Sequence, residues 1–104
     1  MTSTLNERFP VDPDVLAAFC RTNRIRRLSL FGSVLRDDFG PDSDVDVLVE
    51  FEPGATPGLR FFGMQDELSG LVGRRVDLNT ALFLSRYFRN EVLAEAVPIH
   101  AETR

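Results

Sequence analysis

The sequence is poor in several residue types that carry common enzyme chemistries. It has no lysine and no tryptophan, and only one cysteine, one histidine and one tyrosine among 104 residues. All 12 basic residues are arginines, which excludes a Schiff-base lysine and the lysine of a Walker-type phosphate loop. No apolar run approaches the ~20 residues of a membrane helix, so we expect no membrane partner.

The single Cys20 and the single His100 offer little chemistry. Cys20 cannot form an internal disulfide, and no signal segment opens the chain, so we expect a cytoplasmic protein. Cys20 falls on an apolar helical stripe, where we expect a buried small hydrophobe. His100 is expected to be a solvated tail residue.

Length and charge narrow the possible functions. We expect a single domain, because 104 residues are too few for a catalytic domain and a separate substrate-binding domain. A second substrate would then need the surface of a partner. The formal net charge of −4 at pH 7 argues against direct binding of nucleic acid.

Hydrophobic periodicity and capping signals divide the chain into helices and strands. We expect a flexible lead-in over 1–11, one domain over 12–98 and a tail over 99–104. Helices are expected between the Asp12 cap and Asn23, over 59–72 with Gly73 as the closing residue, and over 85–96. Strands are expected over 25–31, 44–51 and 74–80. This order predicts an α/β (α+β) fold with a small mixed sheet of three to four strands packed with helices.

Three aspartates occupy strand positions among apolar residues. Side chains alternate along a strand, so Asp44 and Asp46 point to one face while the intervening valines point to the core. Asp77 lies between two apolar residues and joins the same face if its strand is a neighbour. Two carboxylates at ~4 Å repel by roughly 4 kcal/mol at an effective dielectric of 20, so a cation or arginines should compensate. Mg²⁺ suits such ligands, and solvated positions on an exposed face are the alternative.

Gly32-Ser33 follows the strand 25–31 and precedes a segment that can form only a short helical turn. A strand ending in Gly-Ser at a helix start exposes backbone N–H groups and a hydroxyl, which suits a phosphate. Glycine is needed because a side chain would block close approach. Alone, the pair also fits an ordinary tight turn. Its combination with Asp44-x-Asp46, which follows after ten intervening residues, favours a joint phosphate and metal site.

The combined motif resembles the signature of the DNA polymerase β-like nucleotidyltransferase superfamily. "LFGSVLRDDFGPDSDVDVLVEF" looks like its minimal, single-domain branch, and "LVGRRVDLNT" stands in the place of the third carboxylate strand. The resemblance implies that Asp44, Asp46 and Asp77 are catalytic and hold two Mg²⁺ ions. It also implies that Gly32 and Ser33 grip the phosphates of a nucleoside triphosphate, and that Asp77 assists deprotonation of the acceptor hydroxyl.

Arg36 and Asp37, which follow the glycine turn, both bear on nucleotide binding. Arg36 is a candidate phosphate contact, and a surface ion pair with Asp37 or Asp38 is the alternative. The minimal branch usually has a glycine where this chain has Asp37, which adds a negative charge near the phosphate loop.

The resemblance also implies a partner. Single-domain members are commonly antitoxins of helical HEPN-domain ribonuclease toxins, and some transfer AMP from ATP to a toxin tyrosine. An interface is expected around Phe83, Tyr87 and Phe88. One alternative is an antitoxin with weak or no catalysis that neutralises the toxin by binding, which Asp37 favours. Another is a small-molecule nucleotidyltransferase such as an antibiotic-modifying enzyme.

Overall fold

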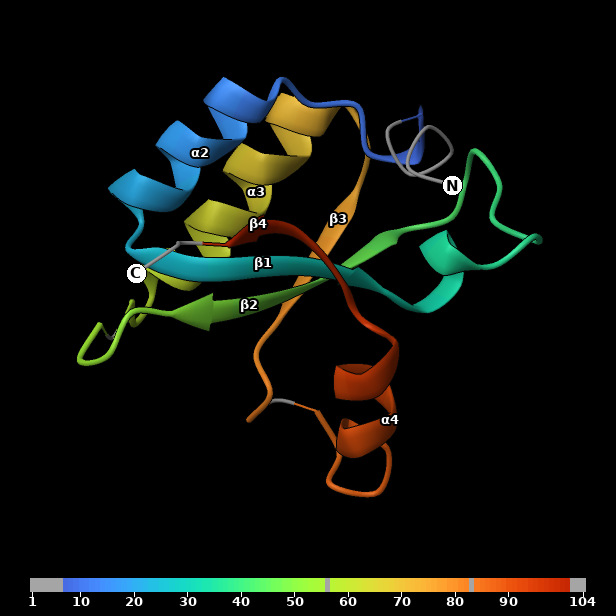
Figure 1. Cartoon of the computed structure of the whole chain (residues 1–104). Coiled ribbons are helices and arrows are strands. Elements are labelled where there is room, and N and C mark those ends of the chain that lie inside the picture. Colours follow the sequence, from blue (N-terminus) through green and yellow to red (C-terminus); the bar gives the residue numbers. More distant parts are fainter. Residues whose placement is uncertain (1–6, 56, 83, 102–104) are drawn as a thin grey trace.

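The computed structural model describes residues 7–55, 57–82 and 84–101, and it places helices on both faces of one four-stranded sheet (Figure 1). The elements follow in the order α2 (Pro13–Thr22), β1 (Ile25–Phe31), a 3₁₀ turn (Gly32–Leu35), β2 (Val45–Phe51), α3 (Arg60–Val72), β3 (Val76–Asn79), α4 (Arg89–Glu95) and β4 (Val97–Ala101). α2 and α3 cover one face of the sheet and α4 lies on the other (Figure 1). The predicted mixed sheet packed with helices is confirmed. Within the described residues, no helix is long and apolar enough to cross a membrane.

Helix α2 begins and ends where its capping residues predict. The Asp12 side chain accepts hydrogen bonds from the backbone N–H groups of Asp14 at 2.7 Å and Val15 at 3.4 Å, which satisfies two of the unpaired donors of the first turn. Asn23 is the C-cap residue. Cys20 is fully buried on the face that contacts the sheet, as expected.

The sheet order is β3-β2-β1-β4. β1 is antiparallel to β2 and to β4, whereas β2 and β3 are parallel. A parallel pair needs a crossover, and α3 supplies it. The helix ends at Gly73, whose φ of 77° lies in the left-handed region that favours glycine. The crossover brings β3 back beside β2 so that both strands start at the same end of the sheet.

Helix α3 also holds the edge strand β3 in register. The Val76 backbone N–H donates to Ser69 Oγ at 3.0 Å, and the Leu78 N–H donates to Gln65 Oε1 at 2.9 Å. These N–H groups face away from β2 and would otherwise lack a strand partner. Asp77 lies between the two anchored residues, so its position in β3, beside Asp46 of β2, is fixed from both sides.

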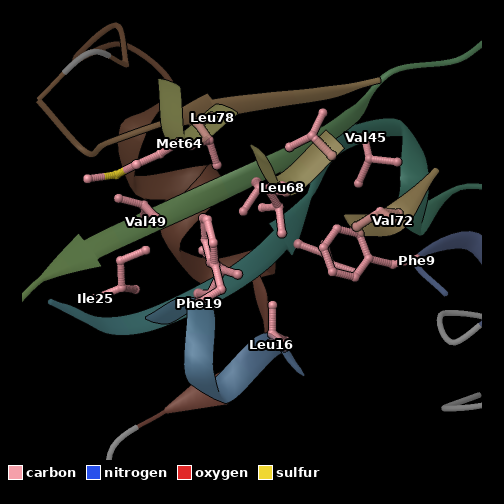
Figure 2. Packing of buried hydrophobic residues seen from close by; sticks show 14 of the residues in the cluster. Phe9, Leu16, Phe19, Ile25, Val45, Val49, Met64, Leu68, Val72 and Leu78 are labelled. Atoms are coloured by element: carbon pink, nitrogen blue, oxygen red, sulfur yellow. The ribbon is translucent and has the colours of Figure 1, made fainter. Parts of the chain in front are cut away.

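The main core fills the space between the sheet and helices α2 and α3 (Figure 2). The valines of β2 point into it, and Ile25, Leu28 and Leu30 of β1 are fully buried. A second, smaller cluster on the opposite face joins Phe31 and Leu48 of the sheet to Leu84 and Val92. This cluster attaches α4 to the face that carries Asp46.

The C-terminal part differs from the prediction. The helix expected over 85–96 is shorter and covers only Arg89–Glu95, and residues 97–101 form strand β4 instead of the end of the domain and a tail. His100 is a half-buried strand residue paired with Leu28 rather than a solvated tail residue. Pro98 concealed this strand in the sequence, because proline in a strand is tolerated mainly at a sheet edge, which β4 occupies.

Residues 7–11 also differ from the loose lead-in that was expected. Phe9 is 5% exposed and belongs to the main core. The Arg8 guanidinium donates hydrogen bonds to the carbonyl oxygens of Val34 at 2.9 Å and Arg36 at 2.6 Å. This segment therefore braces the 3₁₀ turn that follows β1. The remainder of the expected lead-in, 1–6, lies outside the described residues.

The loop between the 3₁₀ turn and β2 is clamped by two arginines. Phe39 has Arg74 over its ring at 4.5 Å and Arg8 at 5.2 Å from the ring centroid. Arg74 also donates to the Gly40 carbonyl at 2.7 Å. Cation–π contacts and hydrogen bonds from a charged donor each stabilise such a loop by about 1 kcal/mol or more when partly desolvated.

We expect Arg74→Ala to lower the free energy of unfolding by about 1–2 kcal/mol, because it removes both the ring contact and the loop hydrogen bond. The neighbouring Arg75→Ala is the matched control, since the Arg75 side chain is 80% exposed and makes a surface ion pair. It should cost about 0–0.5 kcal/mol. Urea unfolding measures both, and equal losses would show that Arg74 does not clamp the loop.

Candidate functional site

The candidate site lies where β1 ends, β2 begins and β3 runs alongside. The strand register pairs Phe31 with Asp46 across β1 and β2, and Asp46 with Asp77 across β2 and β3. Gly32 follows directly after Phe31. The pairing therefore brings together Gly32, Asp46 and Asp77. In the chain, Asp46 comes 14 residues after Gly32, and Asp77 comes 31 residues after Asp46.

Position 32 requires a glycine for two reasons, its backbone conformation and its close contact with Asp46. Its φ of 77° lies in the left-handed region, where a Cβ is strained. A Cβ at this position would also overlap the Asp46 Oδ2 oxygen. The turn and the Asp46 carboxylate can approach each other only because position 32 has no side chain.

Asp46 is the carboxylate most strongly affected by its surroundings. Desolvation by burial raises the pKa of Asp46 above its usual value, and the neighbouring charges of Asp77 and then Asp44 raise it further. The Arg36 guanidinium lowers this pKa and partly opposes the other effects. The three predicted aspartates therefore interact electrostatically in the folded chain.

The Asp44 carboxylate contacts an arginine in this structure. It precedes β2, and its Oδ1 lies 3.4 Å from Nε of the exposed Arg75. Over the described parts of the chain, no three acidic, histidine or cysteine side chains converge closely enough for a metal site. Exposed ion pairs contribute only about 0–1 kcal/mol, so the Asp44 carboxylate can exchange Arg75 for a cation at little cost.

The donor set nevertheless suits a hard divalent cation. Carboxylate oxygens are the ligands that Mg²⁺ takes from proteins, usually one or two together with substrate phosphates. Asp46 and Asp77 already share a sheet face, and the backbone of the Gly32 turn lies directly against the Asp46 carboxylate. This chemistry fits a cation bound together with a phosphate.

Arg36 is held by a residue that the sequence did not indicate. Its Nη2 lies 3.4 Å from Oε1 of Glu95, at the end of α4, rather than pairing with Asp37 or Asp38. Asp37 is exposed, and the only non-glycine residue with positive φ in the described ranges is Arg24. The backbone at Asp37 therefore does not need the glycine that the minimal branch usually has there.

Sequence reasoning missed two partners of the predicted site. Glu95 reaches Gly32 and Arg36, and Arg75 pairs with Asp44. Glu95 had no local signal, because its place depends on the pairing of β4 with β1, and Pro98 interrupts the pattern of β4. For Arg75 the available signal was its position directly before β3, whose start lies beside the start of β2.

An open cavity lies at the other end of β2. It has a volume of about 570 Å³ and is lined by apolar groups that include Phe51, Phe61 and Leu82. It begins at Val49, three residues beyond Asp46 along the strand, so it is distinct from the candidate site.

Comparisons with known proteins agree with this arrangement. A family model described as a nucleotidyltransferase domain matches residues 13–100. The protein adenylyltransferase MntA of Thermococcus cleftensis is 39% identical over 74 residues, which cover 70% of this chain and 73% of that protein.

Solved structures show the same fold. One, assigned as a minimal nucleotidyltransferase, is 36% identical with a TM-score of 0.71, and the match covers 93% of this chain and 94% of the other. A crystal structure of a toxin–antitoxin with AMP-PNP has a TM-score of 0.69 at 17% identity, covering 89% of this chain and 76% of the other. Because the family match runs from α2 into β4 and the solved relative is similar over nearly its whole length, the chain belongs to the nucleotidyltransferase domain family as a minimal nucleotidyltransferase.

Proposed function

We propose that the protein transfers AMP from ATP to a tyrosine hydroxyl of a cognate helical HEPN toxin and thereby acts as an antitoxin. The observation that carries this proposal is the register that sets the Gly32 turn against Asp46 and Asp46 beside Asp77. That arrangement sets the backbone N–H of a glycine turn, a group that suits an anion, beside carboxylates on one sheet face. Transfer of a nucleotidyl group needs both.

In the proposed reaction the toxin hydroxyl attacks the α-phosphorus of ATP. A new O–P bond forms to the tyrosine oxygen, and the bond to the bridging oxygen breaks to release pyrophosphate. Asp77, the most exposed strand carboxylate, would accept the hydroxyl proton. Gly32 and Ser33 would hold the β and γ phosphates through backbone N–H groups and the Ser33 hydroxyl. Arg36 would contribute a further positive charge.

Asp44, Asp46 and Asp77 would hold Mg²⁺. When bound, Mg²⁺ neutralises the triphosphate and stabilises both the attacking and the leaving oxygens of an in-line displacement. Asp44 would exchange its contact with Arg75 for this role. The chain's own contribution is then mainly to position and orient the reacting groups, which supplies much of the catalysis in phosphoryl transfer.

A protein acceptor is supported by the relatives and by the surface. The relative from Thermococcus cleftensis is a protein adenylyltransferase, and the structure with AMP-PNP is a toxin–antitoxin. Around α4, Leu82 and Tyr87 are 84% and 86% exposed, and Phe88 and Leu93 are also exposed. We propose this surface as the docking site of the toxin, since exposed aromatic residues are enriched at interfaces. Phe83, which was expected to belong to it, lies outside the described residues.

Neutralisation by binding alone is the second candidate. The contact of Asp44 with Arg75 favours it, because an arginine then already balances the charge of a carboxylate that the enzyme would need for a metal ion. The two candidates differ in whether ATP is needed, and the Asp46 variant below separates them.

We expect Asp46→Asn to reduce AMP transfer to the toxin by about 10²-fold or more, because the removed charge contributes to transition-state stabilisation. The exposed Asp42→Asn, which removes the same charge from the nearby loop, is the matched control and should keep full transfer. Mass spectrometry of the toxin co-expressed with each variant counts the adenylyl groups.

Transfer that survives Asp46→Asn would refute the assignment of the site. If the wild-type pair carries no adenylyl group and toxin inhibition needs neither ATP nor Asp46, the protein neutralises by binding.

The burial of Asp46 beside other carboxylates should also lower the free energy of unfolding. Its pKa is raised in the folded chain, so between the unfolded and the folded pKa the folded state binds more protons than the unfolded state, and stability falls as the pH rises through that range. At pH 7 without metal, Asp46→Asn should raise the Tm by roughly 2–5 °C, and the gain should shrink as the pH falls towards 4. Thermal unfolding followed by circular dichroism measures this, and a lower Tm at pH 7 would contradict it.

A further inference from the structure

The carboxylate of Glu95 contacts the same groups that the proposed nucleotide would use. The Gly32 backbone N–H donates to Glu95 Oε2 at 3.1 Å, and the Arg36 guanidinium approaches Glu95 Oε1 at 3.4 Å. Each carboxylate oxygen therefore has its own donor. One donor is the glycine of the phosphate turn, and the other is the arginine proposed to assist it.

The fold brings Glu95 to this position. Glu95 is the last residue of α4, and only Ala96 separates it from β4, which pairs with β1 at Val97 and Leu30. The helix is held on the sheet by Val92, which is buried in the second apolar cluster. The end of α4 is therefore fixed beside the end of β1, where Gly32 lies.

A carboxylate and a phosphate are both anions that accept from backbone N–H groups and guanidinium. Two anions at the same donors would repel each other, and one Gly32 N–H cannot serve both in good geometry. A nucleotide whose phosphates reach this turn must therefore displace the Glu95 side chain.

We infer that the Glu95 carboxylate competes with the phosphates of the nucleotide for Gly32 and Arg36. The phosphates can bind there only after this side chain of α4 has moved away. This inference rests on the proposed nucleotide binding at the Gly32 turn. Binding then requires the conformer in which Glu95 has left, and the apparent Kd equals the intrinsic Kd divided by the population of that conformer.

The competition is weak enough to be overcome. The Glu95 side chain is 33% exposed and that of Arg36 is 56% exposed, so solvent screens their attraction. The side chain can swing away without unfolding α4, because Val92 and not Glu95 anchors the helix. Glu95 thus tunes nucleotide affinity and does not close the site permanently.

The test is the binding of AMP-PNP with Mg²⁺ to the full chain by isothermal titration calorimetry. Glu95→Gln keeps the length of the side chain and one acceptor oxygen but removes the charge, and it should tighten the Kd by about two- to fivefold. Glu91→Gln is the matched control, because Glu91 is an exposed residue of the same helix, and its Kd should equal that of the wild type.

A purely structural role for Glu95 predicts a different result. Glutamine would still accept from Gly32, so the Kd of Glu95→Gln would stay unchanged, and this outcome overturns the inference while leaving nucleotide binding intact. Weaker binding by Glu95→Gln with an unchanged Tm also overturns it. If neither the wild type nor the variant binds, the proposed nucleotide site is itself wrong, and the competition fails with it.

The contact itself has an independent readout in the ligand-free protein. The backbone amide signal of Gly32 should shift in nuclear magnetic resonance spectra of Glu95→Gln and of Glu95→Ala, but not of Glu91→Gln. An unmoved Gly32 signal in both Glu95 variants would show that the carboxylate does not reach the turn, and would overturn the inference whatever the Kd values are.

Discussion

The arrangement of the site depends on one close approach, between the backbone of Gly32 and the carboxylate of Asp46. The approach exists because β1 and β2 pair with Phe31 opposite Asp46, and because a Cβ at position 32 would overlap Asp46 Oδ2. The parallel pairing of β2 with β3 adds Asp77 on the same face. A slip of one residue in either pairing would turn these carboxylates towards the core, so the hydrophobic pattern that fixes the register also fixes the site.

Local signals predicted most of this fold. The Asp12 cap, the left-handed Gly73 and the apolar strand 25–31 each depend on neighbours in sequence, and all three lie where the structure has them. β4 escaped because Pro98 interrupts its pattern and its partner β1 is distant in sequence. The burial of Phe9 escaped for a similar reason, since nothing near it in sequence reports its contact with the core.

The residues of the site divide in the same way, into those that local sequence patterns predict and those that they do not. The predicted residues Gly32, Asp46 and Asp77 lie together because strand periodicity and a motif spacing encode their shared face. The side chains that modulate them come from elsewhere, as Glu95 does from α4 and Arg75 from the start of β3. Such long-range ion pairs depend on tertiary packing, so no local pattern could indicate that Arg36 pairs with Glu95 instead of Asp37 or Asp38.

The central claim is that nucleotide binds at the Gly32 turn and the carboxylate face. Its most direct test is to map the backbone amide signals of the isotope-labelled protein during titration with AMP-PNP and Mg²⁺. The account predicts that the largest shifts fall on Gly32, Ser33, Asp46 and Asp77. Shifts confined to residues 49–51 and 80–82, which line the cavity at the other end of β2, with Gly32 and Asp46 unmoved, would contradict it.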